Sequence, residues 1–300
     1  MRYYGRAYRL EIGDNAETLV LDGTGENPAA IEFRVDVGTS QYLSIAQIVI
    51  HAFGRKTQEK AYSRYSRVVL AAGWQERMGT IFDGFIFNVS IGRNGPDSYI
   101  TLYCRSTGST ESTAVLNQTY GAGTPIIQIV RDAAERLGKP VAFYGPSQNI
   151  GTLMRDRPVS QNCITLLKEY GFNYGFRYIA GNSETGIYID EYDDSVGRDH
   201  ETYGGEGGDM IGTPRVLERG IDVDIQMNSD LKIFDAIVVK NATSELNFLS
   251  TTGVSYRDTI GTGRYRIQNI THQGNLYSGE WKTTIEGLNP RYVESRSRQG

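Results

Sequence analysis

The chain has little of several residue types on which functional assignments often rest. Its 300 residues include two cysteines, three histidines and two tryptophans. Cys104 and Cys163 form no spacing motif, so they establish no disulfide framework, and we expect buried free thiols in a reducing compartment. A net charge of −4 argues against a nucleic-acid-binding surface as the main function.

Long hydrophobic runs are also lacking. No apolar run approaches the roughly 20 residues that a membrane-spanning helix needs. The N-terminal stretch MRYYGRAYRLEIG has no apolar core of the kind that a signal peptide requires. We therefore expect a soluble chain that is made in a cytoplasm.

Glycine and tyrosine are abundant instead, with 35 and 20 copies. Tyrosine suits strands and glycine suits turns, so this composition favours a β-rich fold with many turns. A hydrophobic content of 39% over 300 residues is enough for a sizeable core and suggests two or three domains.

The stretch from Arg67 to Cys104 organises the first part of the chain. It contains a short apolar run before Gly73, a long extended segment, a Gly/Asn/Pro turn and a returning strand. Apolar residues near period two with such turns predict an antiparallel hairpin. The apolar members of its long segment are Ile81, Phe82, Phe85, Phe87, Val89 and Ile91.

Further strands are expected before this hairpin, at 8–12, 18–21 and 31–37. The apolar run 43–53 fits a buried helix or a strand, and its β-branched residues favour the strand. Residues 56–65 are polar and predict a short helical turn over a barrel mouth. Six or so short strands suggest a small barrel or sandwich that ends near residue 108.

A small α+β module is predicted after a Ser/Thr/Gly-rich connection over 106–123. Thr124 can cap a first helix, and Gly138 ends it. Ser160 is expected to cap a second helix that ends before Gly171. Residues 172–180 and 186–192 then predict a hairpin. An acidic, glycine-rich linker over 193–209 completes this part of the chain.

A third unit is predicted from residue 208 to residue 290, followed by a loose tail over 291–300. Its strands are expected at 216–217, 221–227, 233–239, 265–270 and 281–288, with a long loop over 242–259. The last hairpin resembles the hairpin that ends at Cys104 in its apolar arm, polar turn and Thr-rich return. Duplication of one unit and chance similarity explain this loose resemblance between the hairpins equally well.

Candidate chemical sites are weak. Asp190, Glu191, Asp193, Asp194, Asp199 and His200 could bind a cation through oxygen ligands, but no EF-hand spacing is present and a solvated linker fits better. The glycines at 204–208 lack the Gly-Lys-Ser/Thr of a phosphate loop. His51, His200 and His272 have no serine elbow or metal-ligand spacing around them, and His272 beside a turn is expected at a surface or interface. We predict no enzyme, no cofactor and no metal.

The chain resembles phage baseplate hub proteins, the family that includes late control protein D. The resemblance rests on IAQIVIHAF, then VVLAAGW, IFDGFIFNV and SYITLYC, and on the last hairpin, which is similar to the family's second tube domain. It implies a mainly β fold with an inserted α+β module and two tube-type antiparallel β-barrels. The implied division is residues 1–108, 109–207 and 208–290, with a tail over 291–300.

The function that this resemblance implies is structural. Such a hub is a homotrimer in the virion tail baseplate that joins the hexameric tail tube to the trimeric central spike. The implied partners are the tail tube protein, the spike protein and baseplate wedge or tape measure proteins. No membrane is implied, and DNA only passes through the channel. Assembly would take place in the host cytoplasm.

Aromatic and apolar residues at hairpin ends are the candidates for subunit contacts or for plugging a barrel end. These candidates are Trp74, Ile81, Phe82, Phe85, His272 and Trp281, with Trp281 favoured for the core and Trp74 for the interface. Two other function classes stay open. A receptor- or carbohydrate-binding β protein is suggested by the tyrosines at 170, 174, 178, 188 and 192, and a tail-associated cell-wall hydrolase by the acidic residues alone.

Overall fold

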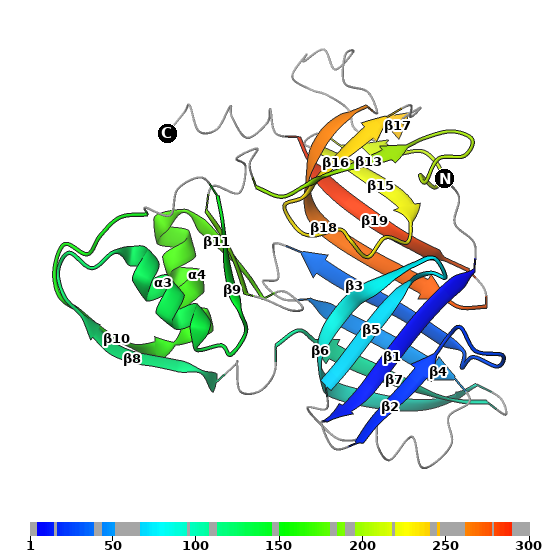
Figure 1. Cartoon of the computed structure of the whole chain (residues 1–300), viewed down its shortest axis with the longest axis horizontal. Coiled ribbons are helices and arrows are strands. Elements are labelled where there is room, and N and C mark those ends of the chain that lie inside the picture. Colours follow the sequence, from blue (N-terminus) through cyan, green and yellow to red (C-terminus); the bar gives the residue numbers. More distant parts are fainter. Residues whose placement is uncertain are drawn as a thin grey trace.

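The computed structural model describes most of the chain, with gaps at several connections. The described residues are 5–14, 17–38, 44–51, 67–94, 97–107, 113–145, 150–180, 185–189, 196–217, 220–240, 245–246, 262–277 and 279–289. They form two β units and one α+β unit (Figure 1). The expected helical turn over 56–65 lies outside the described residues.

The first β unit contains seven strands. They are β1 (Arg6–Asp14), β2 (Glu17–Asp22), β3 (Ile31–Gly38), β4 (Ile45–His51), β5 (Arg67–Trp74), β6 (Arg77–Asn94) and β7 (Asp97–Arg105). Their order in the sheet is β3-β4-β7-β6-β5-β1-β2, and every pair is antiparallel. The strict period-two pattern of β3 buries Ile31, Phe33 and Val35. The strand interpretation of 43–53 is confirmed by β4.

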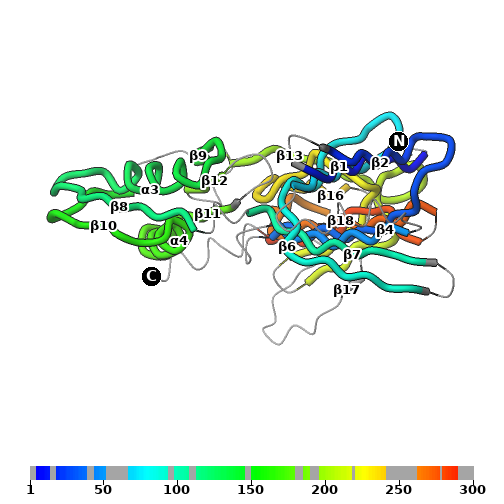
Figure 2. Tube along the Cα trace, turned by 90° about the horizontal axis from the view of Figure 1, so that it is seen from below, coloured from blue at the N-terminus to red at the C-terminus, as the bar shows by residue number. Residues whose placement is uncertain are grey.

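The α+β unit packs two helices against two small sheets. Its elements are β8 (Val115–Tyr120), α3 (Ile126–Glu135), β9 (Val141–Tyr144), β10 (Arg157–Asn162), α4 (Cys163–Tyr174), β11 (Phe176–Ala180) and β12 (Thr185–Ile189). β8 pairs with β10, and β12 lies between β11 and β9. Figure 2 shows this unit at one end of the elongated molecule.

Several local predictions in this unit were wrong. Thr124 does not cap the first helix, because the N-cap residue of α3 is Pro125 and no side chain caps it. The second helix does not end before Gly171, because α4 continues to Tyr174.

Two further corrections concern the start of α4 and the connection before α3. Ser160 does not cap a helix, because it lies in β10 opposite Asn117. The helix begins three residues later, where the side-chain oxygen of Asn162 accepts hydrogen bonds from the backbone N–H groups of Ile164 and Thr165 at 3.0 and 3.2 Å. The connection over 106–123 also contains β8, whose polar sequence VLNQTY buries only Leu116 and Tyr120.

The second β unit begins earlier than the sequence indicated. Its strands are β13 (Asp199–Tyr203), β14 (Arg215–Val216), β15 (Gly220–Gln226), β16 (Ala236–Lys240), β17 (Glu245–Leu246), β18 (Gly263–Asn275) and β19 (Trp281–Leu288). The linker prediction is wrong for 199–203, because β13 pairs with β16 in parallel along its whole length. Most of the predicted loop 242–259 lies outside the described residues, and 245–246 form β17.

The two β units have matching strand orders. In the second unit the order is β14-β15-β19-β18-β16-β13, and in the first it is β3-β4-β7-β6-β5-β1. If the strands of each unit are numbered along the chain, with β2 and β17 left out, strands at the same place in the two lists have the same number. Three differences remain in the described ranges: β13 runs parallel to β16 whereas β1 is antiparallel to β5, β2 has no counterpart in the second unit, and β17 has none in the first. Both units are therefore variants of one antiparallel sheet topology.

Neither sheet closes on itself among the residues that the structure describes. No pairing joins β2 to β3, and none joins β13 to β14. Instead, β18 of the second unit pairs with β3 of the first, so both units share a 14-stranded sheet. The antiparallel β architecture is thus present, without a closed barrel in the described ranges.

Three hydrophobic cores correspond to the three units. Cys104 and Cys163 are buried in the first and second of these cores and form no disulfide. Burial raises the pKa of both thiols, which keeps them protonated and unreactive. In the described ranges, no helix is both long and apolar enough to cross a membrane.

Candidate functional site: the junction of the two β units

The long strand β18 joins the two β units. Its first half pairs with β16 over 263–266, and its second half pairs with β3 over 269–275. A β-bulge between Ile267 and Asn269 separates the halves, where the pairing with β19 shifts. A bulge bends a strand and increases its twist, so it redirects the second half of β18 toward the first unit. We call the β3–β18 pairing the junction seam.

The turn after β18 is also held by the first unit. The Arg6 guanidinium donates to the carbonyl of Gly279 at 3.0 Å and to that of Asn275 at 2.5 Å. The Tyr277 hydroxyl donates to the Pro28 carbonyl at 2.6 Å. These bonds come from the beginning of β1 and from the loop before β3, so the hairpin end of the second unit is fixed on the first.

Trp281 connects the units through packing. It is the first residue of β19 in the second unit, yet its side chain lies in the hydrophobic core of the first and is 4% exposed. Its indole N–H donates to the Gly73 carbonyl at 2.8 Å. Its ring meets Phe33 edge-on, with centroids 5.3 Å apart. Trp281 therefore plugs the core of the neighbouring unit within the same chain, which the sequence did not indicate.

The other aromatic and apolar candidates separate into buried and half-buried positions. Ile81 and Phe82 are buried in the first core, with 2% and 0% exposure. Trp74 and Phe85 are half-buried, Trp74 at the turn and Phe85 at the open end of the β5–β6 hairpin. The Trp74 indole nitrogen is buried and has no hydrogen-bond partner among the residues that the structure describes. Only Trp74 and Phe85 among these four keep part of their surface available to a neighbouring subunit.

His272 is buried at the junction seam, and the expected surface position was wrong. It lies in β18 opposite Val35 of β3, is 3% exposed, and its Nδ1 is 2.9 Å from the Thr283 hydroxyl. Burial lowers its pKa to about 4, although the nearby Asp36 carboxylate opposes this shift. The imidazole is therefore neutral at physiological pH. The polar segment beside His272, where the sequence indicated a turn, is part of the strand, which places His272 inside the sheet.

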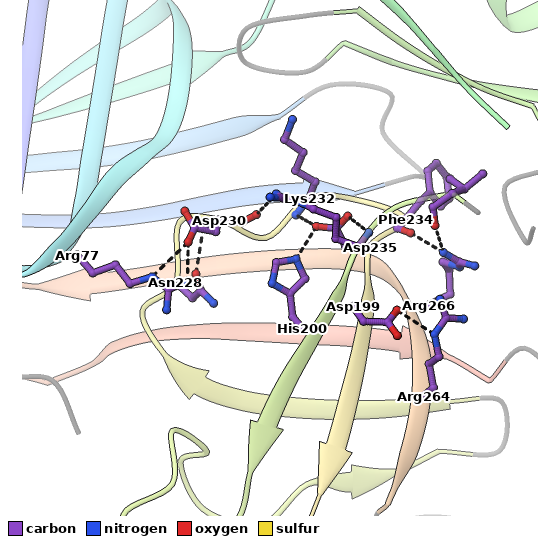
Figure 3. Close-up of polar contacts among 12 residues, drawn as sticks. Arg77, Asp199, His200, Asn228, Asp230, Lys232, Phe234, Asp235, Arg264 and Arg266 are labelled. Atoms are coloured by element: carbon purple, nitrogen blue, oxygen red, sulfur yellow. Dashed lines mark hydrogen bonds and ion pairs between the residues drawn. The ribbon is translucent and has the colours of Figure 1, made fainter. Parts of the chain in front are cut away.

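The connection between β15 and β16 carries a polar cluster on the second unit (Figure 3). The Asp235 carboxylate is 3% exposed and accepts hydrogen bonds from the backbone N–H groups of Arg198 and Lys232, at 2.8 and 3.1 Å. His200 Nε2 lies 2.7 Å from its second oxygen. These bonds satisfy a buried carboxylate, which would otherwise be costly. Asp235 thereby ties β13 to the β15–β16 connection.

Arg266 is a second buried charge in the same region. It is 1% exposed, and its guanidinium donates to the carbonyl of Phe234 at 2.9 Å and to that of Val196. Phe234 has a positive φ of 66°, an uncommon conformation for a non-glycine residue. The bond to its carbonyl helps to hold that conformation. The sequence YRIQNI placed Arg266 in a strand between apolar residues, and that placement was the available signal for a buried arginine.

A salt bridge crosses from this connection to the first unit. Arg77, at the start of β6, has its guanidinium 2.5 Å from the Asp230 carboxylate. Both side chains are largely exposed, so the pair contributes little to stability. The pair joins the β5–β6 hairpin end to the second unit, as Figure 3 shows.

The α+β unit contacts the second β unit through Tyr188. The Tyr188 ring stacks on Tyr144 with centroids 4.7 Å apart and packs against Phe234 at 4.6 Å. Tyr170, Tyr178 and Tyr188 are all buried, with at most 8% exposure. These three tyrosines form part of the packing and present no aromatic face for sugar binding. Tyr192 lies outside the described residues.

A cavity of about 660 Å³ lies where the three units meet. Its lining includes Arg67 and Asp83 from the first unit, Tyr188 from the α+β unit, and Lys232 and His272 from the second. Arg67 and Asp83 form an ion pair at 2.6 Å. The lining mixes charges of both signs with apolar residues, so it selects no particular ion.

The acidic and glycine-rich candidates do not form a site. Asp190, Glu191, Asp193 and Asp194 lie outside the described residues. Asp199 pairs with Arg264, and His200 with Asp235. Within the described ranges, no three His, Cys, Asp or Glu side chains gather where they could hold a metal ion. The glycines at 204–208 make a turn after β13, in which Gly205 and Gly207 have positive φ.

One edge of β6 lacks a partner in the described part of the chain. β5 pairs with β6 only as far as Phe85, and β7 pairs with β6 on its other side to Asn94. The stretch 88–94 therefore has a strand on one side only. Ile91 lies in this stretch and is 39% exposed, and Phe87 lies just before it and is 44% exposed. An unpaired edge beside exposed apolar side chains is suited to pairing with another chain.

Comparisons with known proteins give one matching family model and several similar folds. A family model described as baseplate hub gp41 matches residues 49–251. No curated protein matches the chain. The fold is similar to the 43 kDa tail protein of prophage MuSo2 from Shewanella oneidensis, with a TM-score of 0.58, 8% identity and coverage of 95% of this chain and 98% of that one.

Two further solved structures have the same fold. A tail protein from Neisseria meningitidis MC58 has a TM-score of 0.59, with 7% identity over 95% of this chain and 97% of that one. The E. coli c3393 protein has a TM-score of 0.52, with 12% identity over 88% of this chain and 75% of that one. That protein is described as a type VI secretion component with structural similarity to the T4 tail proteins gp27 and gp5. At such identities the likeness concerns the fold.

Proposed function

This chain belongs to the baseplate hub gp41 family of phage tails, and from that premise we propose that it is a homotrimeric adaptor between a hexameric tail tube and a trimeric central spike. The resemblance to phage baseplate hubs read from the sequence is confirmed by this membership. The finer role concerns symmetry, because a six-fold tube and a three-fold spike share no matching contacts without an adaptor.

The matching strand orders of the two β units carry this proposal. A chain with two similar units presents two similar surfaces, so three chains present six. Each unit also contains one long strand, β6 in the first and β18 in the second. The pairing of this strand shifts at a bulge that lies just beyond the part that pairs with β5 or β16. We propose that the units are duplicated tube-type domains, and that the sheets of neighbouring chains become continuous in the assembled ring.

The open edge of β6 supports assembly through strands. Unpaired edges that carry apolar side chains are unfavourable in a protein that stays monomeric. The edge over 88–94 and the exposed Phe87 and Ile91 are explained if a neighbouring subunit covers them. The partners of the ring would be the tail tube protein on one face and the spike protein on the other. The wedge or tape measure proteins would contact its periphery or channel.

The α+β unit is expected on the outside of such a ring. It packs beside the second β unit through Tyr188 and lies at one end of the elongated molecule (Figure 2). In this arrangement it leaves the sheets free to face the channel. The mature location would be the virion tail, after assembly in the host cytoplasm.

The test is the oligomeric state of the purified chain, alone and with the tail tube protein. Light scattering should give the mass of a trimer, and electron microscopy should show a ring with a central channel. The double variant Phe87→Ser/Ile91→Ser should stay folded and lose the ring. Val115→Ser is the matched control, because Val115 is 49% exposed on the α+β unit, away from the edge. A wild-type chain that remains monomeric under both conditions would refute the trimeric adaptor.

A further inference from the structure

The junction seam provides a template for contacts between chains. Within one chain, the second half of β18, beyond its bulge, pairs with β3 of the other unit over seven residue pairs. The counterpart of β18 is β6, and the second half of β6 has no strand on the equivalent edge among the described residues. The second half of β18 therefore has its partner strand inside the chain, whereas the same edge of β6 is open in the described ranges.

The bulges align the two long strands residue by residue. In β6 the pairing shifts between Ile86 and Asn88, and in β18 between Ile267 and Asn269. Counting on from the bulges, Ser90 corresponds to Thr271, Ile91 to His272 and Gly92 to Gln273. In the junction seam, these three positions of β18 lie opposite Asp36, Val35 and Arg34.

The counterpart of β3 in the second unit is the segment around β14. Arg215 and Val216 lie opposite Asp222 and Ile221 of β15, and Leu217 exchanges backbone hydrogen bonds with Gly220 at 2.9 and 3.4 Å. By the pairing of β15 with β19, these three residues correspond to Arg34, Val35 and Asp36 of β3.

We propose that the open edge of β6 in one chain binds the β14 segment of a second copy, in the register of the junction seam. This inference rests on the proposed trimer and names its contact. The predicted pairs are Ser90 with Leu217, Ile91 with Val216 and Gly92 with Arg215 of the second copy. The contact is head-to-tail, because β6 of one chain meets β14 of the next. A head-to-tail contact generates a ring when its rotation closes.

The edge of β14 that this contact needs is occupied in the single chain. β17 pairs with β14 in parallel through two residue pairs, Arg215 with Glu245 and Val216 with Leu246. Two residue pairs supply only one or two hydrogen bonds, and each bond adds little net stability. β17 therefore protects the edge in the free chain and is displaced when the second copy binds.

Cysteine cross-linking tests the register. Directly opposed residues of antiparallel strands lie within disulfide range, about 4.5–5.5 Å between Cα atoms. The double variant Ser90→Cys/Leu217→Cys, oxidised under ring-forming conditions, should give covalent trimers on a denaturing gel. The double variant Thr271→Cys/Asp36→Cys is the matched control, because it places the same pair in the junction seam. It should cross-link within one chain and remain a monomer on the gel.

A second measurement tests the role of β17. Leu246→Pro removes a backbone N–H from β17 and disfavours the strand. If β17 protects the edge, this variant should assemble at a concentration about 10- to 160-fold lower than wild type, because one to two hydrogen bonds no longer oppose each of the three contacts of the ring. An unchanged or higher assembly concentration would exclude the protective role.

The outcomes separate this inference from the proposed function. A ring without the Ser90–Leu217 cross-link, while the control pair cross-links, would refute the register and leave the trimeric adaptor intact. No ring, with the control pair still cross-linked, would refute the trimer and the inference with it. A cross-linked ladder that extends beyond trimers would support the contact and refute ring closure.

Discussion

Replacing Trp281 with alanine should weaken the attachment of the two β units to each other. The side chain is 4% exposed, its indole N–H bonds to the Gly73 carbonyl at 2.8 Å, and its ring packs edge-on against Phe33. Truncating a buried tryptophan typically costs about 3–5 kcal/mol. Against a total stability of about 5–15 kcal/mol for a domain, that loss is large.

The assay is urea unfolding followed by far-UV circular dichroism. Because Trp281 belongs to β19 and packs in the first core, its loss should damage both units. We expect a lower unfolding midpoint and a broader transition, since the first unit then unfolds with less support from the second. Tryptophan fluorescence is less suitable, because the chain has only two tryptophans and one is removed.

A pair of phenylalanine variants provides the control. Trp281→Phe removes the indole N–H and leaves the Gly73 carbonyl without that donor, which costs about 1–3 kcal/mol. Trp74→Phe is the same chemical change at a half-buried indole whose N–H has no partner in the described part of the chain, and it should cost less. The reasoning is refuted if Trp281→Ala lowers stability by less than about 1 kcal/mol, or if Trp74→Phe is the more damaging of the two phenylalanine changes. Loss of ring assembly at an unchanged melting temperature would instead assign Trp281 to a subunit interface.

Three further predictions follow from buried groups. The pKa of His272 is about 4 in the folded chain and near 6.5 in the unfolded chain. The free energy of unfolding of the wild type should therefore fall by roughly 3 kcal/mol as the pH is lowered from about 6.5 to 4. His272→Gln should lack this pH-dependent loss when urea titrations at pH 7 and pH 4.5 are compared. Arg266→Met leaves two buried carbonyls without their donor and should lower the free energy of unfolding by about 1–3 kcal/mol for each carbonyl, so an unchanged urea midpoint would contradict this assignment. Gly84→Ala places a Cβ 2.2 Å from the Arg105 carbonyl oxygen and should lower the melting temperature by several degrees. Gly25→Ala, whose Cβ would lie 3.9 Å from the Asp22 carbonyl oxygen in ordinary contact, should leave calorimetric melting unchanged.

The pattern of the sequence was sufficient for most strands of the first unit. Residues 31–37 alternate strictly, and their period of two can bury one face only in a strand. The hairpin from Arg67 to Cys104 was equally clear, because Gly, Asn and Pro interrupt its apolar runs. The resemblance to hub proteins rested on these same strands, and it was sufficient to identify the class.

Short and polar elements were not predictable in the same way. β8 and β13 are made of sequences such as VLNQTY and DHETY, which carry no apolar alternation. They form strands because partners far along the chain, β10 and β16, supply their hydrogen bonds. Their strand conformation is determined by tertiary context, which local propensity does not contain.

The junction of the β units was decided by the tertiary structure alone. The sequence showed that Trp281 and His272 lie in the last hairpin, and it favoured a core position for Trp281. It could not show which of the two β units has the core that contains Trp281. The bulge after Ile267 turns β18 onto β3, and this places Trp281 in the first unit and buries His272 between strands that are more than 230 residues apart. A bulge and a long-range register leave no periodic signal in the chain, because they depend on which strands meet in space.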